Sequence, residues 1–214
     1  MSERVQKLVS QNMEKMPWMG TFHSIGAKII RNHAEVIGLK QSFTILDKDD
    51  QLSLIKQIIK AENLDQSQFS PKLIQSKIDH WKNKALNPND IKSESLDNLV
   101  DEKSLSIYKI YQARLFEINC LDFGDLLLQC INLFKVPDIH KRYSNNFKYI
   151  HVDEYQDTNA AQYKWLKLLG SHHQNVCCVG DDDQSIYSWR GAEVDNMLRF
   201  EKEFENAKII RLKQ

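Results

Sequence analysis

The sequence predicts an α/β fold in which a parallel sheet is covered by helices and interrupted by an inserted helical unit. Two apolar runs, at residues 145–152 and 175–179, precede acidic residues and alternate with helical patterns, which is typical of buried parallel strands. Between residues 37 and 116, apolar side chains instead recur at helical period between polar breaks. We therefore expect a discontinuous α/β domain at 1–36 and 117–214, and an all-helical subdomain at 37–116.

The first elements follow from local signals near the N-terminus. Residues 5–16 carry apolar side chains at near-helical spacing, which predicts a short amphipathic helix that ends at Pro17. Residues 18–22 predict the first strand. The next helix is expected to open at His23 and to end at Gly38, because glycine readily adopts the left-handed conformation that terminates helices.

The inserted unit contains recognisable helix starts. Asp47 predicts the N-cap of a helix that runs through residue 60, and Pro71 stands at the first turn of another helix. Lysines near Trp81 are candidates for contact with a duplex backbone: Lys72, Lys77, Lys82 and Lys84. Lysines on an exposed helix are more often simply solvated, and this second interpretation is favoured.

The α/β pattern resumes in the last third of the chain. Its predicted elements are a helix at 123–134, a strand at 145–152, a helix at 160–169 stopped by Gly170, a strand at 175–179 and a strand that begins at 208–212. This alternation predicts a single parallel sheet with helices on both faces.

Composition sets broad limits. The 29 basic and 29 acidic residues give a net charge of zero, so the excess of positive charge expected of a strongly electrostatic nucleic-acid binder is missing. The cysteines have no metal-ligand spacing, and adjacent Cys177 and Cys178 are interpreted as small buried side chains. No apolar run approaches the roughly 18 residues of a membrane span. We expect a soluble, cytoplasmic protein that does not bind a membrane.

Two adjacent carboxylates, Asp153 and Glu154, directly follow the apolar run at 145–152. Open α/β sheets bind ligands at the carboxyl ends of their strands, so this position predicts a site. Mg²⁺ accepts one or two protein carboxylates and keeps waters and phosphate oxygens as its other ligands. We interpret Asp153 as the metal ligand and Glu154 as the group that orients an attacking water. An acidic helix N-terminus after a strand is the alternative explanation.

A second polar segment follows the run at 175–179. Gln184 can both donate and accept hydrogen bonds, which suits a residue that senses a γ-phosphate. Tyr187, Trp189 and Arg190 place two aromatic rings and a guanidinium close together, a combination suited to stacking on unpaired bases and holding their backbone. The alternative for Trp189 is a core aromatic side chain beneath a loop.

Four segments match known helicase motifs in the same order. They are GTFHS at 20–24, LDFGDLL at 121–127, DEYQDTN at 153–159 and GDDDQSIYSWRGA at 180–192. The set resembles motif Ib, the DFDDLL segment, the Walker B motif (motif II) and motif III of the UvrD/Rep/PcrA group of superfamily 1 DNA helicases. The resemblance spans nearly the whole chain and is least specific between residues 37 and 116.

The resemblance implies a RecA-like domain of an ATP-dependent 3′→5′ DNA helicase that acts in replication or repair. It implies ATP and Mg²⁺ as cofactors, and single-stranded DNA and junctions between single and double strands as partners. Phe22 and His23 would face single-stranded DNA, the ring as a stacking surface and the imidazole as a hydrogen-bonding group. For Phe22, a place in the core is an equally simple interpretation.

The sequence departs from the family in lacking a GxxxxGK[ST] loop, which would cradle the phosphates. The chain therefore resembles the middle of a helicase, and the run at 175–179 is expected to present an unpaired strand edge. Two alternatives stay open: a non-catalytic remnant or partner subunit that binds single strands beside a separately encoded remainder, and a fragment of the RecB/AddA branch. Against the second alternative, that branch usually carries a lysine where this chain has GDDDQSIY.

Overall fold

The computed structural model describes residues 18–92, 96, 98–184, 200, 204 and 207–211. Its α-helices are α2 (Phe22–Asn32), α3 (Lys48–Ala61), α4 (Pro71–Asn83), α5 (Leu99–Glu117), α6 (Phe123–Leu133), α7 (Pro137–Asn146) and α8 (Ala160–Gly170). The strands are β1 (Thr44–Leu46), β2 (Cys120–Asp122), β3 (Ile150–Val152) and β4 (Val176–Cys178). Short 3₁₀ turns are η1 (Ala34–Ile37), η2 (Pro88–Asp90), η4 (Tyr155–Asp157) and η5 (Asp182–Gln184).

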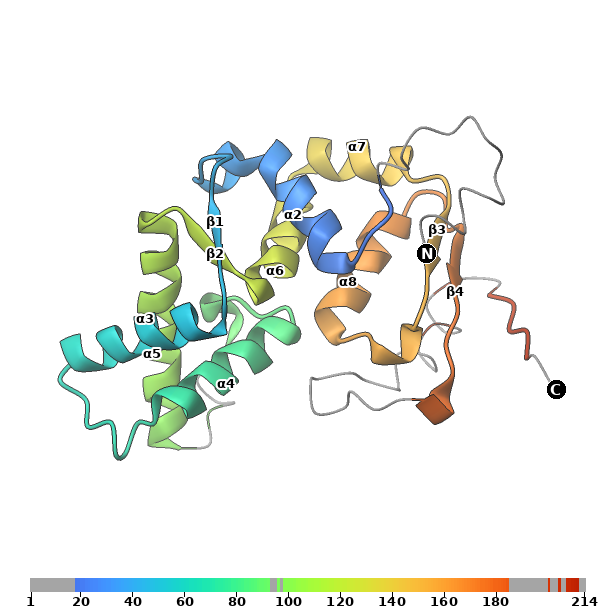
Figure 1. The fold of residues 1–214 in the computed structure, drawn as a ribbon. Helices are drawn as coiled ribbons and strands as arrows, with labels where there is room; N and C mark the ends of the chain where they lie inside the picture. Colours follow the sequence, from blue (N-terminus) through green and yellow to red (C-terminus); the bar gives the residue numbers. More distant parts are fainter. Residues whose placement is uncertain are drawn as a thin grey trace.

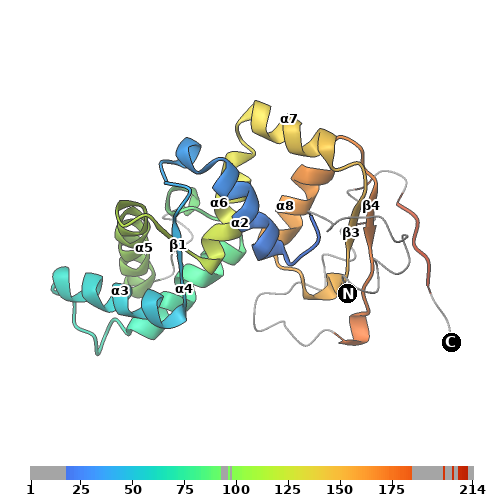
Figure 2. The same ribbon diagram turned by 45° about the horizontal axis from the view of Figure 1, so that its top comes forward.

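The described elements form three groups in a row (Figure 1). Helices α3, α4 and α5 lie together at one end, and strands β3 and β4 lie at the other end. Helices α2, α6 and α8 occupy the space between them, with α7 packed against α8. The turned view preserves this order (Figure 2). The central helices therefore connect the inserted unit to the strands that carry the candidate site.

Helix α2 begins one residue earlier than predicted and packs closely on α6. The Thr21 side chain caps it by accepting a hydrogen bond from the backbone N–H of Ser24 at 3.2 Å. A Cβ atom at Gly26 would lie 2.7 Å from the carbonyl oxygen of Leu126, so only glycine permits this approach of the two helices. The prediction of a strand at 18–22 was wrong, because residues 18–20 form a turn, Thr21 is the cap and Phe22 is the first residue of the helix.

The predicted helix end at Gly38 is also more complex than expected. Helix α2 stops at Asn32, and the separate 3₁₀ turn η1 follows it. Gly38 adopts the left-handed conformation, with φ of 78°, and ends this turn instead of the helix. The glycine signal was therefore correct about local backbone geometry and wrong about which element it terminates.

The inserted unit has its own apolar core, formed where α3, α4 and α5 pack together. Among its fully buried members are Ile55, Ile59, Ile74, Tyr108 and Tyr111. The unit is not all-helical, because strand β1 pairs in parallel with β2, with Ile45 opposite Leu121. A strand of three residues is too short to show alternating burial in the sequence, which explains why it was not predicted.

The predicted single sheet is replaced, among the described residues, by two parallel pairs, β1–β2 and β3–β4. The strand predicted at 145–152 is shorter, since its first residues complete helix α7. The helices predicted at 123–134 and 160–169 are confirmed within one residue as α6 and α8. Residues 208–211 form no strand, and the helix predicted at 5–16 lies outside the described residues.

Two smaller predictions can be compared with the structure. Cys120 and Cys130 are buried, whereas Cys177 is exposed, so the prediction of burial was wrong at Cys177. Cys177 stands in a strand that pairs with β3 alone among the described elements, so its surroundings are more open than those of a strand inside a large sheet. No helix in the described part of the chain combines the length and apolar character that a membrane crossing requires.

Candidate functional site

The predicted carboxylates lie where β3 ends, beside the end of β4. Pairing of the two strands continues beyond their assigned ends, because the N–H of Val179 donates to the carbonyl of Val152 at 2.8 Å and the N–H of Tyr155 donates to the carbonyl of Val179 at 2.9 Å. These bonds bring Asp153 and Glu154 next to the segment that follows β4. We call Asp153 and Glu154 the carboxylate edge.

Both side chains of the carboxylate edge are exposed, and neither forms an ion pair with a described residue. The backbone of Glu154 adopts the left-handed conformation with φ of 52°, an unusual state for a residue with a side chain. The N–H of Glu154 donates to Oδ1 of Asp153 at 3.1 Å. Asn63, Ala85, Asn119 and Gln174 share this backbone state, so the role of Glu154 stays a prediction.

Gln156 connects the carboxylate edge to the segment after β4. Its side chain is buried, and its Nε2 donates to Oε2 of Glu154 at 2.8 Å. Its Oε1 accepts from the backbone N–H of Asp181 at 3.0 Å. The sequence analysis did not identify Gln156, because a glutamine in a 3₁₀ turn carries no local signal that it bridges two loops.

The segment after β4 is folded around Asp181. The carboxylate of Asp181 accepts from Nε2 of Gln184 at 2.6 Å and from the backbone N–H of Asp183 at 3.1 Å. Gln184 is exposed and lies in the turn η5, three residues after Asp181, which contacts Gln156. Hydrogen bonds through Gln156 and Asp181 thus connect Gln184 to Glu154.

Phe22 and His23 open helix α2 on the side of the molecule near this edge. Phe22 is half-buried, with its ring edge-to-face against Trp165 at 5.6 Å, and it packs on the apolar cluster that contains Val152 and Tyr155. His23 is half-buried beside Phe123, and burial lowers the pKa of its imidazole. Their contact with single-stranded DNA stays a prediction.

Three predicted nucleic-acid contacts cannot be placed. Tyr187, Trp189 and Arg190 lie outside the described residues. In the sequence they stand three to six positions after Gln184. Their roles stay predictions.

A second group of charged side chains lies between α4 and the start of α6. The Nζ of Lys82 lies 2.7 Å from Oδ2 of Asp122 and 2.9 Å from Oδ1 of Asp125, and all three side chains are buried. We call these residues the Lys82 cluster. The prediction that Lys82 is solvated or contacts duplex DNA was wrong, because a residue on the inner face of α4 must be buried once α4 packs on α6.

Further hydrogen bonds complete the Lys82 cluster. The hydroxyl of Tyr111 donates to Oδ2 of Asp122 at 2.9 Å, and Nε2 of Gln112 donates to Oδ1 of Asp125 at 3.0 Å. Burial alone would lower the pKa of Lys82, but the two carboxylates raise it above its ordinary value. Burial and the neighbouring Asp122 raise the pKa of Asp125 to about 6. The carboxylates therefore hold the lysine in its charged form.

Among the other lysines predicted as candidate DNA contacts, Lys77 forms an ion pair with Asp101 on α5. The end of α4 also contacts the segment after the carboxylate edge, because Nδ2 of Asn159 donates to Oδ1 of Asn83 at 3.1 Å. Asn159 is the N-cap of α8. Helix α4 thus contacts both α6, through the Lys82 cluster, and the start of α8.

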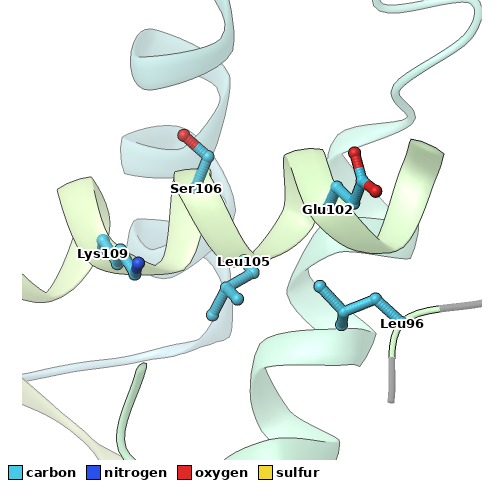
Figure 3. Close-up of a pocket in the computed structure, with 5 residues that line it drawn as sticks. All are labelled: Leu96, Glu102, Leu105, Ser106 and Lys109. Carbon is cyan, nitrogen blue, oxygen red and sulfur yellow. The ribbon is translucent and has the colours of Figure 1, made fainter. Parts of the chain in front are cut away.

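One surface hollow lies on the inserted unit and away from the carboxylate edge. Figure 3 shows Glu102, Leu105, Ser106 and Lys109 of α5 lining it, with Leu96 opposite. These five residues include a single carboxylate and no side-chain amide. The hollow therefore lacks the combination of groups that meets at the carboxylate edge.

Comparison with known proteins agrees with these observations. Residues 1–205 match the family described as "UvrD/REP helicase N-terminal domain". The whole chain is 47% identical to 29% of the "ATP-dependent DNA helicase PcrA" of Staphylococcus aureus. It is 48% identical to 33% of the "DNA helicase II" of Rickettsia typhi, and 46% identical to 33% of a "Probable DNA helicase II homolog" of Rickettsia felis. The chain thus spans about a third of the length of these relatives, and it belongs to the UvrD/REP helicase N-terminal domain family.

Proposed function

We propose that this chain forms part of an ATP-dependent 3′→5′ DNA helicase, which couples ATP hydrolysis to movement along single-stranded DNA and to duplex unwinding in replication or repair. In this proposal, residues 1–36 and 117–214 form the RecA-like ATP-binding domain and residues 37–116 form its inserted subdomain. The observation that carries the proposal is the series of hydrogen bonds through Gln156 and Asp181 that connects Glu154, after β3, to Gln184, in the segment after the adjacent strand β4.

The residues at the carboxylate edge fit a magnesium ion held with a nucleotide. Asp153 and Glu154 are exposed, adjacent and without a described cationic partner, and Mg²⁺ bound with phosphates needs no more than one or two protein carboxylates. Among the described residues, no group of three or more His, Cys, Asp or Glu side chains is placed to hold a metal ion. When bound, the metal would neutralise charge that develops on the phosphates.

Each predicted residue then has a distinct task. Asp153 would hold the metal, Glu154 would orient the attacking water and accept its proton, and Gln184 would contact the γ-phosphate. Tyr187, Trp189 and Arg190, together with Phe22 and His23, would contact the single strand. Coupling between hydrolysis and DNA movement would follow from the short distance in sequence between Gln184 and Trp189.

The most direct test is a chimera in which this chain replaces the matching stretch of the Staphylococcus aureus helicase. We expect ATP-dependent unwinding by the chimera and its loss in Glu154→Gln, since the carboxylate is needed to activate water. Glu62→Gln, which alters an exposed glutamate after α3, is the matched control and should unwind normally. A folded chimera that hydrolyses no ATP in the presence of DNA would refute the proposal.

A non-catalytic protein that binds single strands is the second candidate. These 214 residues contain no GxxxxGK[ST] loop, so we expect no DNA-stimulated ATP hydrolysis by this polypeptide alone. Fluorescence anisotropy with single-stranded oligonucleotides measures the binding that both candidates require. Trp189→Ala should weaken this binding by about 1–3 kcal/mol if its ring stacks on a base. Equal affinities of the wild type and Trp189→Ala for the oligonucleotide would show that the Trp189 ring does not stack on a base.

A further inference from the structure

We propose that Gln156 and Asp181 are positioning residues that transmit changes between Glu154 and Gln184. This inference rests on the proposed function, which makes Glu154 the water-orienting group and Gln184 the γ-phosphate contact. Its structural basis is a continuous series of hydrogen bonds, which we call the Gln156 relay. The relay runs from Oε2 of Glu154 through the amide of Gln156 to the N–H of Asp181, and from Oδ2 of Asp181 to Nε2 of Gln184.

The chemistry of its partners determines how the Gln156 amide must point. An ionised Glu154 carboxylate only accepts hydrogen bonds, so it must face the Nε2 of Gln156. A backbone N–H only donates, so Asp181 must face Oε1. No other common side chain of this length offers one donor and one acceptor at its tip, which explains why glutamine suits this place. An amide flip would break both bonds at once.

The surroundings leave the Gln156 amide little freedom. The side chain is 1% exposed, and the backbone beside it is held by the bond from the N–H of Tyr155 to the carbonyl of Val179 at 2.9 Å. On the other side, Gly180 stands so close that a Cβ atom there would lie 2.8 Å from Oε1 of Gln156. If Glu154 moves, the Gln156 amide and Asp181 must therefore move with it, or a hydrogen bond of the buried Gln156 amide must break.

The relay links two groups that would contact a nucleoside triphosphate from different loops. The carboxylate edge follows β3, and the loop around Asp181 follows β4. A γ-phosphate that draws Gln184 toward itself would pull on Asp181, and through Gln156 on the group that orients the attacking water. The Gln156 relay thus provides a direct route by which the arrival or loss of the γ-phosphate would change the position of Glu154.

The first test uses NMR spectroscopy of the chain without nucleotide, so its result does not depend on the proposed function. Glu154→Asp retracts the carboxylate by one methylene and keeps its charge. In the wild type, we expect this change to shift the signals of the Asp181 backbone amide and the Gln184 side-chain amide. In the Gln156→Met background, which keeps the length of the side chain and removes its polar tip, both shifts should disappear.

Two further variants make this test specific. Gln129→Met removes the amide of another buried glutamine, on α6, and should leave the shifts at Asp181 and Gln184 as large as in the wild type. Gly180→Ala leaves every hydrogen-bonding side chain in place but crowds Oε1 of Gln156, and it should abolish the shifts as Gln156→Met does. Shifts of Gln184 that are equal with and without the Gln156 amide would overturn the proposal.

The chimera provides the functional part of the test. Gln156→Met should lower its turnover number by a factor on the order of 100, as expected when a reacting group is misplaced, with little change in the KM for ATP. Unchanged turnover, together with loss of the NMR shifts, would show that the relay exists and has no role in hydrolysis, which also overturns the proposal. A chimera that is inactive even with Gln156 in place would instead identify a failure of the proposed function.

Discussion

The Lys82 cluster and the carboxylate edge both place acidic side chains at the end of a short parallel strand, but these side chains are buried in the first and exposed in the second. In each, acidic side chains lie at or after the end of a three-residue parallel strand: β2 ends at Asp122, with Asp125 in the first turn of α6, and Asp153 and Glu154 directly follow β3. The first pair is buried and forms ion pairs with Lys82 from the inserted unit. The second pair is exposed and has no ion-pair partner among the described residues.

This difference shows what decides whether such carboxylates serve structure or chemistry. A buried carboxylate is costly unless it is paired and hydrogen-bonded, so the element that covers it must bring a cation. Helix α4 covers the end of β2 and brings Lys82 to it. No described element covers the end of β3, and its carboxylates keep the hydration and the access that a metal–nucleotide complex would use.

The largest effect is expected when the Lys82 cluster loses its cation. Lys82→Met leaves two carboxylates buried without their partner, and it should lower the free energy of unfolding by about 3–5 kcal/mol. Lys84→Met, two residues away and exposed on the same segment, is the control and should change stability by no more than about 0.5 kcal/mol. Urea denaturation measures both. Similar losses in the two variants would show that the cluster is not a buried ion pair in solution.

The second prediction concerns the whole cluster. The triple variant Lys82→Met, Asp122→Asn and Asp125→Asn removes all the charges while keeping a residue at 122 that can cap α6. Because the desolvation cost disappears together with the attraction, it should be more stable than Lys82→Met alone by about 2 kcal/mol or more. A triple variant that is less stable than the single variant would mean that the three side chains act mainly through shape.

A third prediction concerns pH. The pKa of Asp125 is raised to about 6 in the folded protein, above its ordinary value, so the folded state holds this proton more tightly than the unfolded state. The stability that Asp125 contributes is therefore present at low pH and is lost as the pH rises through about 6. Between pH 4 and pH 7, the free energy of unfolding of the wild type should fall by roughly 1–3 kcal/mol relative to that of Asp125→Asn. If the difference in free energy of unfolding between the two proteins stays constant across this range, the pKa of Asp125 is not raised.

The smallest effect is expected at the carboxylate edge, where backbone strain replaces buried charge. Glu154 has φ of 52°, which costs about 1 kcal/mol or more for a residue with a Cβ atom. Glu154→Gly should therefore be more stable than Glu154→Ala by about 1 kcal/mol, because both variants lose the hydrogen bond to Gln156 and only alanine keeps a Cβ atom in the left-handed conformation. Thermal melts compare the two variants. A glycine variant that is no more stable than the alanine variant would show that the turn is unstrained.

Much of the local structure was predicted from residues that are close in the sequence. Helices α6 and α8 were predicted within one residue, because their apolar spacing and their caps act over a few positions. The place of Asp153 and Glu154 directly after a strand was predicted for the same reason. The family was also identified at this level, since the motifs that carry the resemblance are continuous segments, and the match over residues 1–205 confirms it.

What the tertiary structure alone decided concerns residues far apart in the chain. The burial of Lys82 depends on Asp122, 40 positions away, and the role of Gln156 depends on Asp181, 25 positions away. The pairing of β1 with β2 joins segments separated by helices α3, α4 and α5. Hydrophobic spacing and capping report only on a residue's immediate neighbours, whereas the meaning of a charge or an amide depends on what packing brings next to it. The sequence by itself therefore determined where helices such as α6 and α8 form and which family the chain belongs to. The packing of the elements determined which carboxylates are buried in an ion cluster and which remain open to a ligand.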